Sequence, residues 1–256
     1  MTAAPSPPLA RERTLILGGL VLLAAGAWAL LIWQAATMDQ MHMGLTMGMG
    51  APLFLALWVA MMVAMMFPTA APMILLFART AATKRQRGQA YVPAWVFVSA
   101  YLVVWTLFGV LAYGAAVGAN KLADESRWLL IHAARLGGVA LIVAGLYELS
   151  PLKSVCLSKC RSPLSFVMQH WRDGYRGAFH MGIQHGVYCL GCCWLLFVIL
   201  FPLGVMNIAV MAVITLLIYA EKVFPVGRQV ARAAGGALVL YGLVVLAIPG
   251  ALPTTL

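Results

Sequence analysis

Long apolar segments recur along this chain, and they limit its fold more than any other feature of the sequence. Of its residues, 63% are hydrophobic and only 9% are charged, whereas a soluble domain carries about 25% charged residues. Seven segments of about 18 to 27 residues are long enough to cross the ~30 Å hydrocarbon core of a bilayer as helices. They cover residues 15–33, 51–78, 93–118, 129–149, 178–201, 205–221 and 232–249. Because lipid offers the backbone no hydrogen bonds, they predict an all-α bundle of about seven transmembrane spans.

The basic residues between these segments predict the orientation of the chain. Lys and Arg cluster before the first segment and within 79–87, 153–176 and 222–232, which all fall on one side of the membrane. The connections on the other side contain only Lys121 and Arg127. Positive charge prefers cytoplasmic loops, so we expect a cytoplasmic N-terminus and an external C-terminus. Membrane orientation and attraction to anionic headgroups account for the net charge of +10, so this charge does not indicate a nucleic-acid partner. We expect a multi-pass protein of the bacterial inner membrane.

The sequence predicts a single membrane domain over 15–251, between a disordered cytoplasmic tail (1–14) and a short tail (252–256). Two of its connections contain residues with metal or redox chemistry: an outer loop at 34–50 and a cytoplasmic loop at 150–177. Within the cytoplasmic loop, Ser162-Pro163 is typical of a helix start, so we expect a short interfacial helix through Trp171.

The fifth segment contains HGVYCLGCCW (185–194), which is unusually rich in soft donors. On a helix, His185, Cys189 and Cys193 are spaced i, i+4, i+8 and share a face, with Met181 one turn before them and Cys192 nearby. Thiolate, thioether and imidazole groups together favour Cu(I), with Zn(II) next. The competing explanation is that these cysteines are small packing residues in a membrane helix.

A second pair, Cys156 and Cys160, lies in the basic cytoplasmic loop. CxxxC spacing places both sulfurs on one side of a helical turn, and Lys153, Lys159 and Arg161 are expected to lower the pKa of both thiols. In the reducing cytosol such a pair is more typical of metal binding or redox exchange than of a structural disulfide. An incidental pair is the alternative.

The outer loop is rich in methionine. It contains Met38, Met41, Met43, Met47 and Met49, with Asp39 and His42 among them. Thioethers bind Cu(I) without deprotonation, so Met41, His42 and Met43 are predicted to collect copper outside the membrane. The alternative is that methionine fills irregular gaps in a flexible loop.

The second segment carries a methionine block before Pro68. Counted from the ends of their segments, Met62, Met65 and Met66 fall at the same depth as Cys189 to Cys193, near mid-membrane. We therefore expect a shared intramembrane metal site, although ordinary packing also explains methionine here. Pro68 is expected to kink the helix and free backbone carbonyls.

Ionisable residues near the predicted inner interface have a simpler explanation. Glu148, Glu221 and Lys222 lie close enough to this interface for solvation or pairing to account for them.

Several motifs together resemble the DUF2182 family of predicted metal-binding membrane proteins, some of which are labelled copper chaperones. They are WVAMMVAMMFPTAAP (58–72), PLKSVCLSKCRSP (151–163), GYRGAFHMGIQHGVYCLGCCW (174–194), GVMN (204–207) and EK (221–222). The resemblance spans residues 58–225 and implies metal binding. By position it points to Cys156, Cys160, His185, Cys189, Cys192, Cys193, Met62, Met65 and Met66. The outer loop lies outside these motifs.

The sequence contains no GxSxG, Walker, HExxH or Ser-His-Asp signature, which favours a binding or transfer protein over an enzyme. We expect it to bind Cu(I) and pass it to or across the membrane, with a cuproenzyme or a cytosolic thiol metallochaperone as partner. One alternative is a thiol-disulfide oxidoreductase that uses the CxxxC and CxxCC cysteines. Distance counts against it, because Cys160 and Cys189 are expected to need a large motion to meet. A non-catalytic assembly factor is the other alternative.

Overall fold

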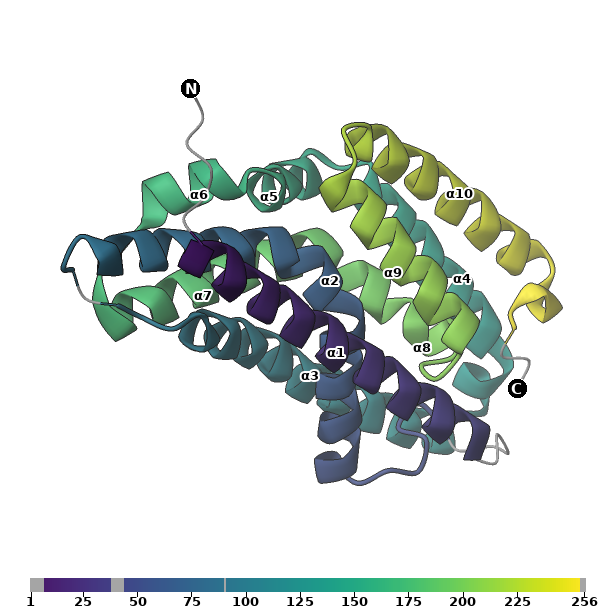
Figure 1. Ribbon diagram of the computed structural model, residues 1–256. Helices are drawn as coiled ribbons and strands as arrows, with labels where there is room; N and C mark the ends of the chain where they lie inside the picture. Colours follow the sequence, from purple (N-terminus) through teal and green to yellow (C-terminus); the bar gives the residue numbers. More distant parts are fainter. Residues whose placement is uncertain (1–6, 38–43, 90, 254–256) are drawn as a thin grey trace.

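The computed structural model describes residues 7–37, 44–89 and 91–253, and its secondary structure over these residues is entirely helical (Figure 1). The elements are α1 (Pro7–Thr37), α2 (Ala51–Gln86), α3 (Ala94–Glu125), α4 (Arg127–Glu148), α5 (Pro151–Arg161), α6 (Pro163–His170), α7 (Gly174–Val198), α8 (Leu200–Leu203), α9 (Ile208–Val223), α10 (Gly227–Ala247) and the 3₁₀ turn Pro249–Ala251. The prediction of an all-α protein is confirmed.

Six stretches of helix among the described residues are long and apolar enough to cross a membrane, which fits a multi-pass protein. They are α1, α2, α3, α4, α10 and the stretch Gly174–Leu203 that joins α7 to α8. The predicted segment 205–221 corresponds to α9, whose 16 residues reach about 24 Å at 1.5 Å per residue. This is shorter than a ~30 Å hydrocarbon core, so the expected seventh span has no helix of full length. At the N-terminus, α1 begins at Pro7, so residues 7–14 of the predicted tail are helical.

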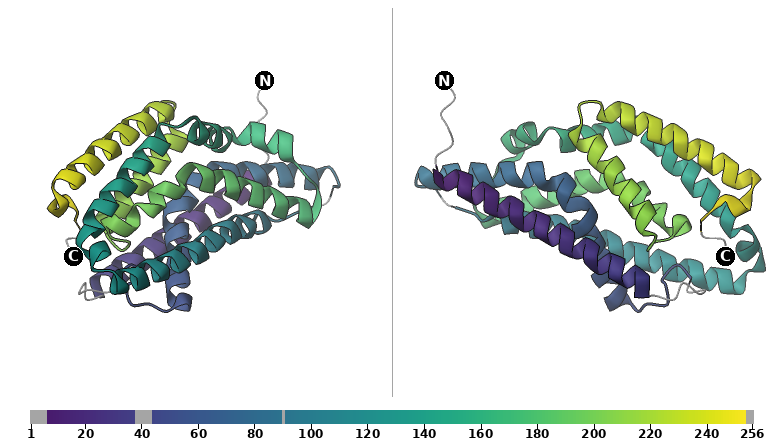
Figure 2. Two further views of the ribbon diagram at one scale, coloured as in Figure 1. Left: turned by 180° about the vertical axis from the view of Figure 1, so that it is seen from behind. Right: turned by 45° about the vertical axis from the view of Figure 1, so that its right-hand side comes forward.

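The long helices pack in three main pairs: α1 with α2, α3 with α7, and α4 with α10 (Figures 1 and 2). Glycines bring α4 and α10 into backbone contact. A Cβ on Gly145 would lie 2.6 Å from the Gly235 carbonyl oxygen, and one on Gly242 would lie 2.7 Å from the Gly138 carbonyl oxygen. Small residues at matched positions let membrane helices approach this closely.

The helix α2 bends sharply along its length (Figure 1) and contains Pro68 and Pro72. Proline has no N–H, so Pro68 leaves the Ala64 carbonyl without its helical donor. The indole of Trp28 in α1 donates to this oxygen at 3.1 Å. The expected kink is present, and the freed carbonyl binds a neighbouring helix.

The cytoplasmic connection predicted at 150–177 folds mainly as two short helices, α5 and α6, along the upper edge of the molecule in Figure 1. Ser150 caps α5 by accepting a hydrogen bond from the Lys153 amide at 3.2 Å. Ser162 is the N-cap residue of α6, which ends at His170. The predicted short helix is therefore confirmed to within a residue of Trp171. Because α5 packs against α7, the CxxxC pair lies beside the cysteines of α7.

Candidate metal centre

Four buried thiols meet where α5 packs against α7. Cys192 Sγ lies 3.2 Å from Cys193 Sγ and 3.9 Å from Cys160 Sγ, and it donates to the Cys189 carbonyl oxygen at 3.2 Å. Cys160, Cys189, Cys192 and Cys193 are all buried, and all five cysteines of the chain are free. We call these four side chains the thiol cluster.

Close helix packing brings the thiol cluster together. In α7, a Cβ on Gly182 would overlap the Phe97 carbonyl of α3, and one on Gly186 would lie 2.9 Å from Val104. On another side of α7, Gly191 leaves room for Cys156 of α5, because a Cβ on Gly191 would lie 2.9 Å from Cys156 Sγ. The hydroxyl of Tyr147 also donates to the Gly191 carbonyl. Cys156 therefore packs against α7 without joining the cluster.

The contact between Cys160 and Cys192 corrects the expectation that the cytoplasmic and membrane cysteines are far apart. That expectation treated 150–177 as a loop outside the bundle. In the structure α5 is a helix that packs against α7, so one of its cysteines reaches the cluster. No large motion is needed for the two groups of thiols to meet.

The predicted lowering of the pKa of the CxxxC thiols is also wrong. Burial raises the pKa of Cys156 above its ordinary value. Hydrogen bonding to Cys189, followed by burial, raises the pKa of Cys160 well above that value. The nearby cations are engaged elsewhere. Lys153 pairs with Glu221 and Glu148, and Arg161 donates to the carbonyls of Glu221 and Pro225.

Cys189 has two polar partners outside the cysteine motifs. Tyr101 Oη of α3 and Lys222 Nζ of α9 each lie 3.0 Å from Cys189 Sγ. Lys222 also donates to Thr69 Oγ1 of α2 at 3.5 Å. A buried cation thus lies against a sulfur, so Cys189 is the thiol best placed to bear negative charge.

Sequence reasoning did not connect these partners with the cysteines. Lys222 is buried beside the cluster. The sequence alone predicts instead that it is solvated or paired near the membrane interface. Its place in the EK motif, together with the cost of a lysine in an apolar segment, was the available signal. Tyr101 and Thr69 sit in ordinary helical sequence, and no spacing rule marks them.

Next to the cluster, Lys153 lies between two carboxylates. Its ammonium contacts Glu148 of α4 and lies 2.8 Å from Glu221 Oε2 of α9, and all three side chains are buried. Burial alone would lower the pKa of Lys153, but the charges of Glu221 and Glu148 outweigh it and raise the pKa. This triad joins α5, which carries Cys160, to α4 and α9.

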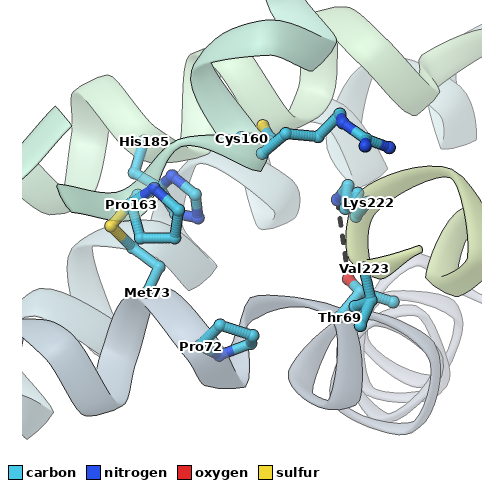
Figure 3. A pocket seen from close by; sticks show the side chains of 9 residues that line it. Thr69, Pro72, Met73, Cys160, Pro163, His185, Lys222 and Val223 are labelled. Carbon is cyan, nitrogen blue, oxygen red and sulfur yellow. Dashed lines mark hydrogen bonds between the residues drawn. The ribbon is translucent and has the colours of Figure 1, made fainter. Parts of the chain in front are cut away.

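A cavity of about 200 Å³ opens beside the cluster, and we call it the side cavity. It is lined by Thr69, Pro72, Met73, Cys160, Arg161, Pro163, His185, Lys222 and Val223. In the view of Figure 3, His185 and Met73 are drawn on one side of it, and Lys222 and Thr69 on the other. The wall of the cavity therefore includes Cys160, which belongs to the cluster, and Lys222, which contacts it.

The imidazole of His185 is held by aromatic rings. It stacks on Phe97 and Tyr101, with ring centroids 5.8 Å and 5.6 Å away, and meets the edge of Phe166. Its Nδ1 is buried and has no hydrogen-bond partner among the described residues. A buried polar nitrogen without a hydrogen-bond partner costs free energy, and a ligand that binds this atom would remove that cost.

The predicted methionine ligands have a different placement. Met62, Met65, Met66 and Met181 are buried, and none of them lines the side cavity. Met62 and Met66 do share a face of α2 with Thr69, which contacts Lys222. The shared site with Cys189 and Cys193 stays a prediction. Met41, His42 and Met43 lie outside the described residues.

Within 7–37, 44–89 and 91–253, no group of three His, Cys, Asp or Glu side chains surrounds a common point in the way a metal ion requires. The cluster thiols instead touch one another in pairs. Thiol sulfurs are the donors that soft metals such as Cu(I) prefer.

Comparison with known proteins shows the family of this chain. The profile of a family described as copper chaperone, PpoB2, matches residues 55–245, well over half of the chain. The matched range includes α5, α7 and α9, and with them the whole thiol cluster and Lys222. No curated protein and no solved structure matches the chain. The apolar helices, the buried soft donors and this match together show that the chain belongs to the copper chaperone family.

Proposed function

We propose that this protein binds Cu(I) in the thiol cluster within the membrane and passes it on to a partner. The observation that carries the proposal is the meeting of four buried thiols from two helices, next to a buried lysine. Copper is the cargo here. The family match favours a protein that carries the ion over one that retains it, and the resemblance to DUF2182 supports metal binding.

The chemistry of binding follows from the contacts. When Cu(I) inserts, Cu–S bonds replace the contacts between thiols, and each thiol that coordinates releases its proton. One thiolate balances the charge of Cu(I), and the Lys222 ammonium beside Cys189 offsets the charge of a second, which reduces the cost of burying the ion in an apolar bundle. Exchange between neighbouring sulfurs then lets the ion move without losing all of its ligands. A cytosolic thiol metallochaperone or a cuproenzyme is the partner that such exchange suits.

A competition measurement tests the proposal. The full chain, purified in detergent under anaerobic reducing conditions, is titrated with Cu(I) against a chromophoric chelator. The wild type is expected to take a stoichiometric amount of Cu(I) from the chelator. The variant Cys189→Ser/Cys192→Ser/Cys193→Ser is expected to take none.

Cys156→Ser is the matched control for this measurement. Cys156 lies on the same short helix as Cys160, but its sulfur packs against Gly191 and is half-buried, whereas the four cluster thiols are buried. The control is expected to bind Cu(I) like the wild type. Binding by the triple variant at the wild-type level would rule out the cluster as the copper site.

One contact also favours a second function, thiol-disulfide exchange. Cys160 Sγ and Cys192 Sγ lie 3.9 Å apart on different helices, so a small shift is enough to join them. The same purified protein separates the two functions. A metal-free chain with a reducible Cys160–Cys192 disulfide, identified by mass spectrometry of its peptides, would support the oxidoreductase. If the purified protein neither binds Cu(I) nor contains this disulfide, a non-catalytic assembly factor is the function that is left.

A further inference from the structure

We propose that the side cavity is the place where Cu(I) is loaded: Met73 and His185 hold the arriving ion, and Cys160 then takes it into the thiol cluster. This inference rests on the proposed function and adds to it a second, weaker copper site and an order of events. Met73 is a ligand that neither the cysteine motifs nor the methionine block identified.

The size and lining of the cavity support a site for an ion together with a small ligand. A volume of about 200 Å³ compares with ~30 Å³ for one water molecule in the liquid. The cavity therefore has room for Cu(I) with a water molecule or a small ligand still attached. Its wall includes a thioether, an imidazole and a thiol, which are the donors that Cu(I) prefers.

His185 provides the observation that points to a ligand. Its side chain is 3% exposed, and Nδ1 has no hydrogen-bond partner among the described residues. Stacking on Phe97 and Tyr101 fixes the plane of the ring. Met73, which is 2% exposed, lines the same cavity with a donor that needs no deprotonation.

The charges around the cavity argue that its site is transient. Met73 and His185 are neutral donors, and the Lys222 ammonium and the Arg161 side chain, which line the same cavity, disfavour a further cation. The cluster instead offers thiols that become thiolates when they coordinate, and these neutralise the ion. Cu(I) is therefore expected to stay only briefly in the cavity and to bind firmly in the cluster.

Cys160 connects the side cavity with the rest of the thiol cluster because it lines the cavity and also contacts Cys192. In the transfer, Cu–S bonds to Cys160 and Cys192 form while the Cu–S bond to Met73 and the Cu–N bond to His185 break. The protons of both thiols leave to water in the cavity. Copper stays Cu(I) throughout, so the step requires no oxidant or reductant.

The test measures the rate of loading separately from affinity. Reduced, metal-free protein in detergent is mixed in a stopped-flow instrument with Cu(I) in acetonitrile, a small weak ligand, and the Cu(I)–thiolate absorbance is followed. Met73→Leu keeps the volume of the side chain, so the fold is retained. We expect it to slow loading at least about tenfold, equivalent to 1.36 kcal/mol of barrier, without changing Cu(I) affinity at equilibrium.

Met61→Leu is the matched control. Met61 lies on the same helix and is also 2% exposed, but it does not line the cavity. It is expected to load at the wild-type rate. His185→Gln serves as a second variant and is expected to slow loading as Met73→Leu does. Its thermal unfolding is measured as well, to check that it is folded.

The outcomes separate this inference from the proposed function. Normal loading by Met73→Leu, with normal affinity, overturns the loading site and leaves the thiol cluster intact as the copper site. Equal slowing by Met61→Leu also overturns it, because the effect would then come from general packing. If the wild type binds no Cu(I) at all, both proposals fail together.

Discussion

At the scale of single residues, Lys153 shows how a buried charge can organise the metal centre. It pairs with Glu148 and Glu221 from two other helices, and its own helix carries Cys160. A buried ion pair adds little net stability, but the loss of one partner leaves an uncompensated charge. The triad therefore constrains where α5 can lie.

Replacing Lys153 by methionine tests this role. Lys153→Met leaves two buried carboxylates without their cation, which is expected to cost about 3–5 kcal/mol of unfolding free energy. Lys159→Met, on the same helix but partly exposed, is expected to have little effect. Denaturant unfolding in detergent micelles measures both. Equal stability of Lys153→Met and the wild type would show that the triad does not hold α5.

Residue types alone predict a soft-metal site here, but they do not show which side chains meet in it. The sequence marked His185, Cys189 and Cys193 because soft donors at helical spacing are costly in lipid without a role. It missed Tyr101 and Lys222 as partners of Cys189. These residues are 88 and 33 positions away from it in sequence, and local spacing rules do not reach that far.

At the scale of the helices, glycine on α7 decides how close the thiol cluster lies to α3. Gly182 packs on the backbone of α3, where an added Cβ would lie 2.6 Å from the Ala100 Cβ. The same contact between α3 and α7 brings Tyr101 to Cys189. Helix separation and the polar contacts of the cluster are therefore coupled.

Alanine at Gly182 is expected to push α3 and α7 apart and to destabilise the protein by about 1–3 kcal/mol, as overpacking of a core does. Gly114 of α3 is the control, because a Cβ there meets nothing within 4 Å. Gly114→Ala is expected to be neutral or to stabilise by up to about 1 kcal/mol. Thermal unfolding of the two variants in the same detergent measures the difference. A smaller loss for Gly182→Ala than for Gly114→Ala would contradict the close packing.

The helices themselves were largely predictable, because length and hydropathy determine which segments can span a bilayer. The kink in α2 followed from Pro68 in the same way. The position of α5 was not predictable. Its 11 residues are polar enough to read as a loop, and only the packing of Leu157 and Cys160 in the core shows where it lies.

At the scale of the whole molecule, the arrangement of the connections bears on the orientation in the membrane. In Figure 1, α5, α6 and the connection between α9 and α10 lie at the upper edge. The connections α3–α4 and α8–α9 lie at the lower right. The helices α5 and α6, which carry most of the basic cluster 153–176, and the connection within 222–232 thus fall toward one edge, as a cytoplasmic side requires.

Reporter fusions test the topology. A fluorescent protein fused after Arg87 or Arg172 is expected to fold and fluoresce in the cytoplasm. Alkaline phosphatase, which needs an oxidising compartment, is expected to be active after Leu256. An external C-terminus requires α9 to cross the membrane despite its 16 residues. Fluorescence at the C-terminus would instead show that α9 does not span the bilayer.

The sequence by itself determined the helical class of this protein, and its residue types predict the chemistry. Apolar length requires helices in a bilayer because the backbone has no other hydrogen-bond partners there. Soft side chains in such helices indicate a soft metal. The tertiary structure alone decided which side chains meet. Cys160 joins Cys192 because α5 packs on α7, and Lys222 reaches Cys189 because α9 packs beside them. These contacts depend on helix packing, in which residues distant in the sequence come together, and no local pattern encodes that packing.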